Sequence, residues 1–360
     1  MGFYLLIIGI LVLFSVVRLG QLRERNFLAL AMLFLYLLAT LRAVEIGNDT
    51  RHYSEIFAEV RSNLTQLTLE AGYLCINSLI GSFTDNFYVF LAVTDAVIYY
   101  AYYKLIKKYS SNYVLSVLLF LCFGFWGDTI NIIRQELAIA MFLYVYILTD
   151  DGKKIRGFIL GILAPLFQRT SLSYFIYFLI PRRINKKFYA IAGPIGVLTV
   201  LLIDRIIMLV TRFVPRFGRY LLDTSKYKLG RVEPAVVLYC VFLLVVWALA
   251  LYVYEHAGDN IESDEWTVQI EMQINMVFTA FLIMLVATKF NLLDRCAMFF
   301  NIFVIILIPN MISMIKKDEY RHLVQSGFTL AAIGYFVVVC IFRPDWNHIY
   351  PYRMFFQSLN

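Results

Sequence analysis

Long apolar segments dominate this chain of 360 residues. Segments 2–17, 236–254 and 297–315 contain no charged residue, and about 20 apolar helical residues cross the roughly 30 Å hydrocarbon core of a bilayer. The pattern predicts an all-α polytopic integral membrane protein with about ten transmembrane helices. The predicted spans are residues 2–19, 26–43, 85–104, 112–126, 129–149, 187–211, 234–254, 268–288, 294–315 and 323–342.

Composition supports a membrane location for the whole chain, which we treat as a single transmembrane domain, 1–360. Hydrophobic residues make up 61% of it and charged residues only 16%, against about 25% charged in soluble domains. The net charge of +7 fits basic loops held against anionic membrane lipids. No basic domain stands outside the membrane, so nucleic acid is not an expected partner. The five cysteines match neither a metal site nor a disulfide framework.

The distribution of Lys and Arg predicts the orientation. Basic residues lie in the alternate short loops 18–25, 104–108 and 153–156, which the positive-inside rule places in the cytoplasm. The N-terminus, the acidic loop 44–84 and the turn 124–128 then face outward. The first apolar segment lacks a small-residue cleavage site, so we expect a retained helix rather than a signal peptide.

Segment 155–181 is apolar but is interrupted by Pro165 and by Gln168, Arg169 and Thr170. As one straight helix it would be about 40 Å long, with Arg169 near the middle of the bilayer. We favour a re-entrant or broken hairpin with an outward tip, because an unpaired central Arg is costly. The hairpin makes 212–231 a basic external loop, which suggests an anionic ligand. Binding to lipid headgroups is the simpler alternative.

Two polar clusters interrupt this apolar pattern. Segment 41–53 (LRAVEIGNDTRHY) gathers charges of both signs around Gly47 beside a predicted span, an expensive arrangement that needs partners and a task. In the second cluster, the polar residues are three or four positions apart and share a helix face; they are Asp128, Asn131, Arg134 and Gln135. We expect Asp128 to be a helix N-cap and Arg134 to fork two phosphate oxygens. The structural alternative for Arg134 is a buried ion pair with Glu136 or a neighbouring helix.

A third polar cluster, 291–295 (NLLDR), offers Asn291 as a helix cap and Arg295 in the first turn. With the hairpin topology, segment 41–53, Arg134, Arg169, loop 212–231 and Arg295 all reach the outer surface. Several basic groups around an acidic Gly-Asp loop indicate an active site for an anionic lipid-linked substrate.

The order of these motifs resembles a known family. The pattern Arg42-x4-Gly47-x-Asp49-Thr50-x2-Tyr53-x3-Phe57 is similar to the first motif of EpsG-family, Wzy-like polysaccharide polymerases. Later similarities follow in the same order and cover nearly the whole chain: Glu70-x-Gly72-Tyr73, Ile133-Arg134-Gln135-x2-Ala138, Phe167-Gln168-x-Thr170-Ser171-Leu172, Arg295 with Ile308-Pro309, and Ile349-Tyr350-Pro351-Tyr352. Gln168 stands where the family usually has His, and glutamine orients a hydroxyl but does not take its proton.

The resemblance implies a GT-C-like membrane glycosyltransferase architecture and a reaction. Such enzymes join oligosaccharide units on undecaprenyl diphosphate at the outer face of the bacterial cytoplasmic (inner) membrane, for O-antigen, capsule or exopolysaccharide. An acceptor hydroxyl attacks the anomeric carbon and lipid diphosphate leaves. A chain-length regulator is a further candidate partner. No Asp-x-Asp motif is present, and we expect neither a metal nor a cofactor.

The implied roles fall into three groups. The catalytic candidates are Asp49, as a base with Glu45 and Asp128 in reserve, and Arg134. The diphosphate-binding candidates are Arg51, Arg169, Arg216, Arg219 and Arg295. The substrate-binding candidates are Arg42, Glu45, Tyr53, Tyr73, Asp128, Asn131, Gln135 and Gln168. Tyr53, Tyr73 and Trp126 are candidates for stacking on sugar rings, although interfacial aromatic residues are commonly anchors.

Two other functions fit parts of the sequence. A flippase or transporter of lipid-linked oligosaccharides would use the same basic surface, but the chain shows no internal repeat of the kind common in transporters. A membrane acyltransferase would need a catalytic base, for which His52 is the best placed of the four His residues.

Overall fold

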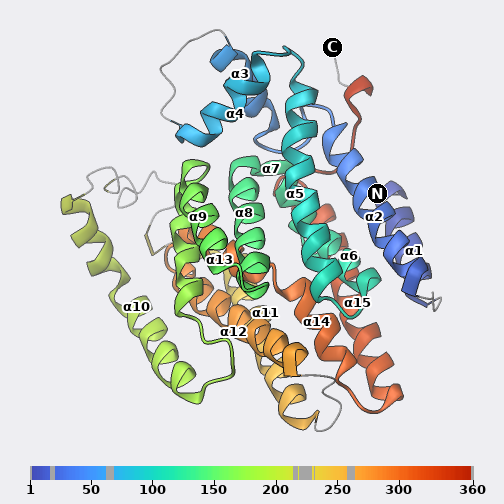
Figure 1. Ribbon diagram of the computed structural model, residues 1–360, viewed down its shortest axis with the longest axis vertical. Helices are drawn as coiled ribbons and strands as arrows, with labels where there is room; N and C mark the ends of the chain where they lie inside the picture. The colour runs from blue at the N-terminus through green and yellow to red at the C-terminus, as the bar shows by residue number, and fades with distance from the viewer. Residues whose placement is uncertain are drawn as a thin grey trace. The chain divides into compact units, whose positions relative to one another are not determined.

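The computed structural model describes residues 2–16, 21–61, 69–213, 218, 229–230, 232–257 and 264–357. These residues form helices and contain no strand, as the apolar pattern predicts. The chain divides into two compact units, Met1–Leu172 with Lys317–Asn360, and Ser173–Lys316, whose elements are labelled in Figure 1.

The first unit is built around helix α5 (Phe87–Tyr109), which packs against α2 (Gln21–Thr40) and α8 (Ile133–Asp150). Helix α6 (Tyr113–Cys122) packs against α1 (Gly2–Val16), α2 and α15 (Asp318–Phe342). Large rings fill the centre, and Phe90, Phe120 and Phe142 are fully buried. The interior of this unit is therefore a core of closely packed apolar side chains between the helices.

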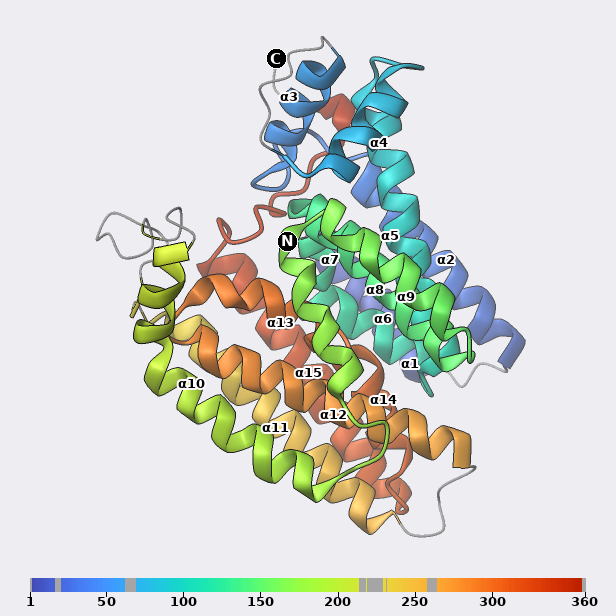
Figure 2. The ribbon, with the colours of Figure 1, turned by 60° about the vertical axis from the view of Figure 1, so that its left-hand side comes forward.

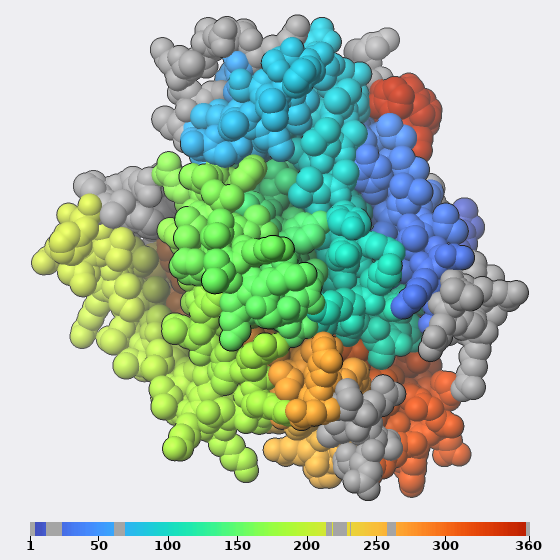
Figure 3. Space-filling model, viewed as in Figure 1, coloured from blue at the N-terminus to red at the C-terminus, as the bar shows by residue number. Residues whose placement is uncertain are grey.

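Two short helices, α3 (Thr50–Arg61) and α4 (Ala71–Gly81), pack against each other beside the N-terminal end of α5 (Figures 1 and 3). Helix α3 is amphipathic: Tyr53, Ile56 and Phe57 are buried, whereas Arg51 and His52 are exposed. Apolar positions three and four residues apart give such a helix one buried face. Both helices lie within the predicted loop 44–84.

The predicted span 129–149 does not begin as expected. Helix α7 (Phe125–Asn131) ends at Asn131, and α8 begins at Ile133 after a break at Ile132, whose φ and ψ are −117° and 55°. The prediction that Asp128 is an N-cap is wrong, because Asp128 lies inside α7 and Gly124 occupies the cap position with φ 91°. Helices α6 and α7 are bent by 55° relative to each other.

Segment 155–181 is broken, as Pro165 suggests. Helix α9 (Lys154–Leu163) leads into a 3-10 turn, η1 (Ala164–Leu166), and a second 3-10 helix, η2 (Arg169–Leu179), follows after Phe167 and Gln168. Helix α9 packs along α8. The re-entrant course of this segment stays a prediction.

The second unit centres on α12 (Asp264–Ala287), which packs against α10 (Lys186–Phe213), α11 (Pro234–His256), α13 (Asp294–Asn301) and α14 (Val304–Ser313). A 3-10 turn, η5 (Asn291–Leu293), precedes α13. The N-cap position of α13 is Leu293 and carries no side-chain cap, so the prediction that Asn291 caps this helix is wrong.

Five helices in the described residues are long and apolar enough to cross a membrane, namely α5, α10, α11, α12 and α15. The number rises to seven if α6 with α7, and α13 with α14, each form one bent span. Only 17%, 22% and 17% of the apolar windows of α10, α11 and α15 is buried, as helices that face lipid require. The protein is a multi-pass membrane protein; predicted spans 2–19, 26–43 and 129–149 correspond to helices α1, α2 and α8, which do not pass the same test.

Candidate active site

Arg42 is fully buried at the end of α2 and is held by protein groups. Its Nε donates to Thr50 Oγ1 at 3.3 Å, one terminal nitrogen lies 3.3 Å from Asp95 Oδ2 and also donates to the Ala39 carbonyl, and the other donates to the Ile130 carbonyl at 3.2 Å. Both members of the Arg42–Asp95 pair are 0% exposed. The prediction that Arg42 contacts substrate is therefore wrong: its donors fix the chain around Gly47.

The loop after Arg42 turns at Gly47, whose φ is +87°. A Cβ at this position would lie 2.8 Å from Thr50 Oγ1 and 2.9 Å from Ile130 Cγ2, so both the backbone conformation and the space require glycine. The next amide, of Asn48, donates to Asn131 Oδ1 at 2.5 Å. The loop is thus closed against the end of α7.

The C-terminal segment holds the same loop from the other side (Figure 2). The Gly47 amide donates to the His348 carbonyl at 3.1 Å, and Asn48 Nδ2 donates to the Trp346 carbonyl at 2.6 Å. Asn131 Nδ2 donates to the Asn347 carbonyl at 2.8 Å. Asn131 is 5% exposed and ties the loop to the C-terminal segment, which is a structural role rather than the predicted contact with substrate.

Asp128 faces the same C-terminal segment. Asn347 Nδ2 lies 3.5 Å from Asp128 Oδ1, and a Cβ on Gly127 would lie 2.5 Å from that nitrogen. Helix α7 and the C-terminal segment are therefore in close contact, and Asp128 is half-buried there. This position makes it a less direct candidate base than Asp49.

Glu45, Asp49 and Arg51 are charged residues of this loop and of the first turn of α3, which follows it. Arg51, with 65% of its side chain exposed, lies 3.5 Å from Glu45, which is 25% exposed. Asp49 is half-buried and directly precedes α3, where its carbonyl accepts the Tyr53 amide at 2.9 Å. Asp49 forms no ion pair with the part of the chain that the structure describes.

Two arginines, Arg134 and Arg169, share the carboxylate of Glu70. Arg134, at the start of α8, donates to Glu70 Oε2 at 2.7 Å, and Arg169, at the start of η2, lies 3.9 Å from Glu70 Oε1. The exposed fractions are 24% for Arg134, 12% for Glu70 and 57% for Arg169. The structural alternative for Arg134, an ion pair, is realised with Glu70 and not with Glu136, which accepts a bond from Tyr102 instead.

Close packing brings Glu70 to this position. Glu70 directly precedes α4, and a Cβ on Gly72 in the first turn would lie 2.9 Å from the Leu166 carbonyl oxygen. Only glycine allows α4 to approach η1 so closely. Glu70 had no assigned role in the sequence interpretation, although it stands in one of the motifs; its contact with Arg134 joins residues 64 positions apart.

Two tyrosines support the arginine cluster from inside. Arg134 favours the ionised form of the Tyr53 hydroxyl and lies 5.8 Å from the centroid of the Tyr73 ring. The Tyr53 and Tyr73 rings meet edge to face at 6.0 Å. Burial raises the pKa of Tyr53, Arg134 opposes that shift, and Asp49 adds to it, so both charged groups act on this hydroxyl.

The predicted stacking of sugars on aromatic rings fails for these residues. Tyr53 is 3% exposed, and Tyr73 and Trp126 are 0% exposed. Trp126 donates from its indole nitrogen to the Leu35 carbonyl at 3.3 Å. All three rings pack the interior of the first unit.

A polar group follows at the start of η2. The Thr170 hydroxyl donates to Gln135 Oε1 at 2.5 Å, which links η2 to α8. Gln135 is 2% exposed and Gln168 is 7% exposed. Gln168 Oε1 and Ser171 Oγ are buried without a hydrogen-bond partner among the described residues, so each has an unused capacity to bind a hydroxyl group.

Residues 25–354 match the EpsG family. The chain belongs to the EpsG family. No curated protein and no solved structure matches it.

Membership in the EpsG family points to a polysaccharide polymerase. In this member, the residues that carry the first motif divide into two kinds. Arg42, Gly47 and Tyr53 build the loop and its support, whereas Asp49 acts on Tyr53 and forms no ion pair within the described part of the chain. Several residues of the first motif, the charged Arg42 among them, therefore stabilise the loop.

The remaining predicted diphosphate-binding residues of this EpsG-family chain are Arg216, Arg219 and Arg295. Arg216 and Arg219 fall outside the described residues. Arg295 is in the first turn of α13 in the second unit and is half-buried. The convergence of these three residues with Arg134 stays a prediction.

Proposed function

We propose that this protein polymerises oligosaccharide repeat units that are carried on undecaprenyl diphosphate, at the outer face of the bacterial cytoplasmic membrane. The observation that carries the proposal is the Glu70 carboxylate between Arg134 and Arg169, beside the loop that presents Asp49. Family membership supplies the polymerase class, and the cluster supplies groups suited to the leaving diphosphate.

The reaction concentrates negative charge on the leaving group. An acceptor hydroxyl attacks the anomeric carbon, the bond from that carbon to the diphosphate oxygen breaks, and the lipid diphosphate takes both electrons. Preorganised cationic donors stabilise such charge most where they need not rearrange. Glu70 holds Arg134 at 2.7 Å, so the guanidinium is oriented before substrate binds.

One carboxylate does not saturate two guanidiniums. Each arginine carries five N–H donors, and the cluster of Glu70, Arg134 and Arg169 has a net charge of +1. The Nε of Arg134 is buried without a partner in the described residues, and 57% of the Arg169 side chain is exposed. Donors therefore remain for phosphate oxygens, which arginine binds with two parallel bonds.

A carboxylate is also needed for the proton of the attacking hydroxyl. We propose Asp49 in this role, because it is half-buried, acts on the Tyr53 hydroxyl as Arg134 does, and has no ion-pair partner in the described residues. Gln168 and Ser171 are proposed to orient the acceptor sugar through their unpaired oxygens. Arg216, Arg219 and Arg295 are proposed to add further contacts to the diphosphate.

The test is incubation of the purified full-length protein with a lipid-diphosphate oligosaccharide, followed by separation of the products. The wild-type protein should give a ladder of lengthened chains, and Asp49→Asn and Arg134→Ala should each reduce its rate about 100-fold or more, the scale at which single electrostatic and acid–base groups act. Arg156→Ala is the matched control, because Arg156 is exposed in the first turn of α9 and should leave the ladder unchanged.

Each outcome of this test decides between functions. A full ladder from both site variants would show that the site is assigned wrongly. Movement of a labelled lipid-linked oligosaccharide across vesicles, without extension by the wild-type protein, would show a flippase instead of a polymerase.

A further inference from the structure

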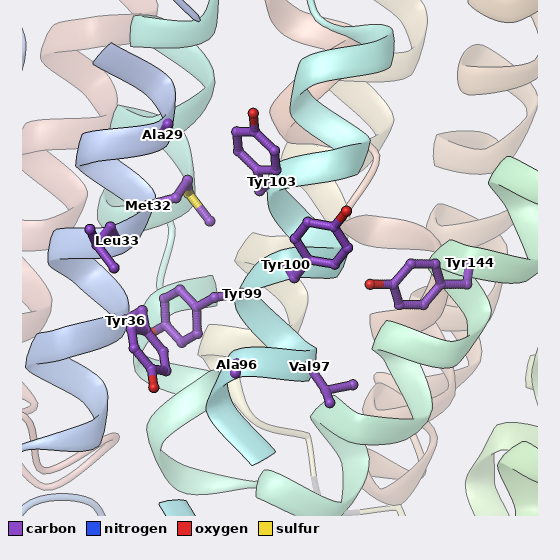
Figure 4. Close-up of a pocket in the computed structure, with 10 residues that line it drawn as sticks. All are labelled: Ala29, Met32, Leu33, Tyr36, Ala96, Val97, Tyr99, Tyr100, Tyr103 and Tyr144. Atoms are coloured by element: carbon purple, nitrogen blue, oxygen red, sulfur yellow. The ribbon is translucent and has the colours of Figure 1, made fainter. Parts of the chain in front are cut away.

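A separate groove lies on the first unit, between α2, α5 and α8. It has a volume of about 590 Å³, within the range of small-ligand sites. Its walls are apolar side chains and tyrosine rings, including Met32, Val97, Tyr100, Tyr103 and Tyr144. Figure 4 shows the Tyr100 and Tyr144 rings pointing toward each other from α5 and α8, and their centroids are 6.5 Å apart.

Two lysines lie beside two of the tyrosine rings that line this groove. Lys104 Nζ is 5.8 Å from the centroid of Tyr100, and Lys107 Nζ is 5.2 Å from the centroid of Tyr103. Both lysines are exposed, and neither forms an ion pair within the described residues. Their neighbour Lys108 differs, because it is neutralised by Asp150 and Asp151 at 3.1 and 2.5 Å.

We propose that this groove binds an anionic glycerophospholipid of the surrounding membrane. One acyl chain lies along the apolar wall, and the phosphate binds the ammonium groups of Lys104 and Lys107. The charge pattern carries the choice of ligand: an apolar groove beside two lysines that form no ion pair in the described residues fits a lipid with an anionic head, and a zwitterionic lipid gains less there. Tyrosine hydroxyls also suit the headgroup region of a bilayer.

The groove is distinct from the proposed diphosphate site. Tyr144 follows Arg134 by ten residues in α8, which is about 15 Å along a helix. The lysines lie near the C-terminal end of α5, whereas Glu70 and α4 lie beside its N-terminal end (Figure 1). A phosphate on Lys104 therefore occupies a different site from one on Arg134, and this inference does not depend on the proposed function.

The test is native mass spectrometry of the purified full-length protein with equal amounts of phosphatidylglycerol and phosphatidylcholine. The wild-type protein should retain phosphatidylglycerol about tenfold more strongly. Lys104→Gln with Lys107→Gln should remove that preference, a tenfold loss that equals about 1.4 kcal/mol. The control is Lys153→Gln with Lys154→Gln, which removes the same charge from exposed positions outside the groove and should change nothing.

A second variant tests the apolar wall. Val97 is 40% exposed in the groove, so Val97→Trp should fill the groove without disturbing the core and should reduce the retention of both lipids, with an unchanged elution volume in size-exclusion chromatography. Equal retention of both lipids by the wild-type protein would overturn the proposal, and so would an equal loss in the control variant. Displacement of phosphatidylglycerol by an equal amount of polyprenyl diphosphate, lost in the Lys104/Lys107 variant, would assign the groove to the substrate lipid instead.

Discussion

The buried Arg42–Asp95 pair offers the sharpest test of how the loop around Gly47 is held. Asp95→Asn keeps the shape of the side chain and removes its charge. Both partners are 0% exposed, and removal of one member of a fully buried ion pair typically costs about 3–5 kcal/mol, because the other charge stays buried without its partner. We therefore expect Asp95→Asn to lower the free energy of unfolding by about 3 kcal/mol or more.

The measurement is unfolding of the purified protein by a denaturing detergent, followed by intrinsic fluorescence. Lys108→Met is the matched control, since it breaks ion pairs with Asp150 and Asp151 in which the Lys108 side chain is 31% exposed. Exposed and partly exposed pairs contribute about 0–1 kcal/mol. Equal, small losses in Asp95→Asn and Lys108→Met would refute the reasoning that burial makes the Arg42–Asp95 pair costly to break.

A double variant separates the pair from its surroundings. Arg42→Met with Asp95→Leu removes both charges, and replacement of a whole buried pair by apolar residues is often close to neutral. The carbonyls of Ala39 and Ile130 then lose a donor, so we expect a loss of about 2 kcal/mol from unsatisfied carbonyls. The double loss should be smaller than the sum of the single losses, which is the signature of direct coupling.

The other predictions concern the loop and the arginine cluster. Gly47→Ala should destabilise the loop by about 1–2 kcal/mol, since φ is +87° and the new Cβ meets Thr50. Gly152→Ala is its control, because φ there is +78° but no heavy atom lies within 4 Å of the new Cβ. Gly47→Ala should shorten the product ladder more than this control does. Asn131→Ala should cost about 2 kcal/mol in the same unfolding assay, because it leaves the Asn48 amide and the Asn347 carbonyl without their bonds; an unchanged midpoint would contradict this. Glu70→Gln should lower the KM for the lipid diphosphate, because it removes an anion that competes for Arg134. It should also lower kcat about tenfold, because Arg134 loses the carboxylate that orients it. A lower KM with an unchanged kcat would argue against preorganisation of Arg134. Burial raises the pKa of Tyr53 above its ordinary value of 10.0, so its hydroxyl stays protonated and its contribution to stability is lost only as the pH rises above about 10; Tyr53→Phe should therefore leave the shape of the pH–rate profile between pH 6 and 9 unchanged.

The sequence pattern was sufficient for the class of protein and for much of its helical structure. Seven of the predicted spans correspond to a long apolar helix or to a bent pair, because a long charge-free segment has few alternatives to a buried or lipid-facing helix. The break at Ile132 carried no such signal. No proline marks it, and it depends on Asn131, whose side chain bonds the Gly127 carbonyl, the loop and the C-terminal segment.

The candidate site was predicted in part, and its errors have one physical cause. Arg42, Tyr53 and Tyr73 were expected at the surface because they stand beside a charged loop, but the partners that bury them come from distant segments. Asp95 lies 53 residues after Arg42, in the middle of an apolar segment. A carboxylate within a predicted span should itself have indicated a buried cationic partner. Glu70 was missed for the same reason, since its motif carried no sign of which arginines it meets.

The distribution of carboxylates among the arginines favours Asp49 over Glu45 as the proposed base. Asp95 neutralises Arg42 in the interior, Glu45 is paired with Arg51, and Glu70 is shared by two arginines. Arg51 engages Glu45 Oε1, and Glu45 Oε2 is buried without a hydrogen-bond partner among the described residues, whereas a base must offer an oxygen that the attacking hydroxyl can reach. Asp49 has both oxygens free of ion pairs with the described residues, and it acts on the same Tyr53 hydroxyl as Arg134. The negative charge that is proposed to accept a proton and the positive charge that is proposed to hold the leaving group therefore both act on one buried tyrosine.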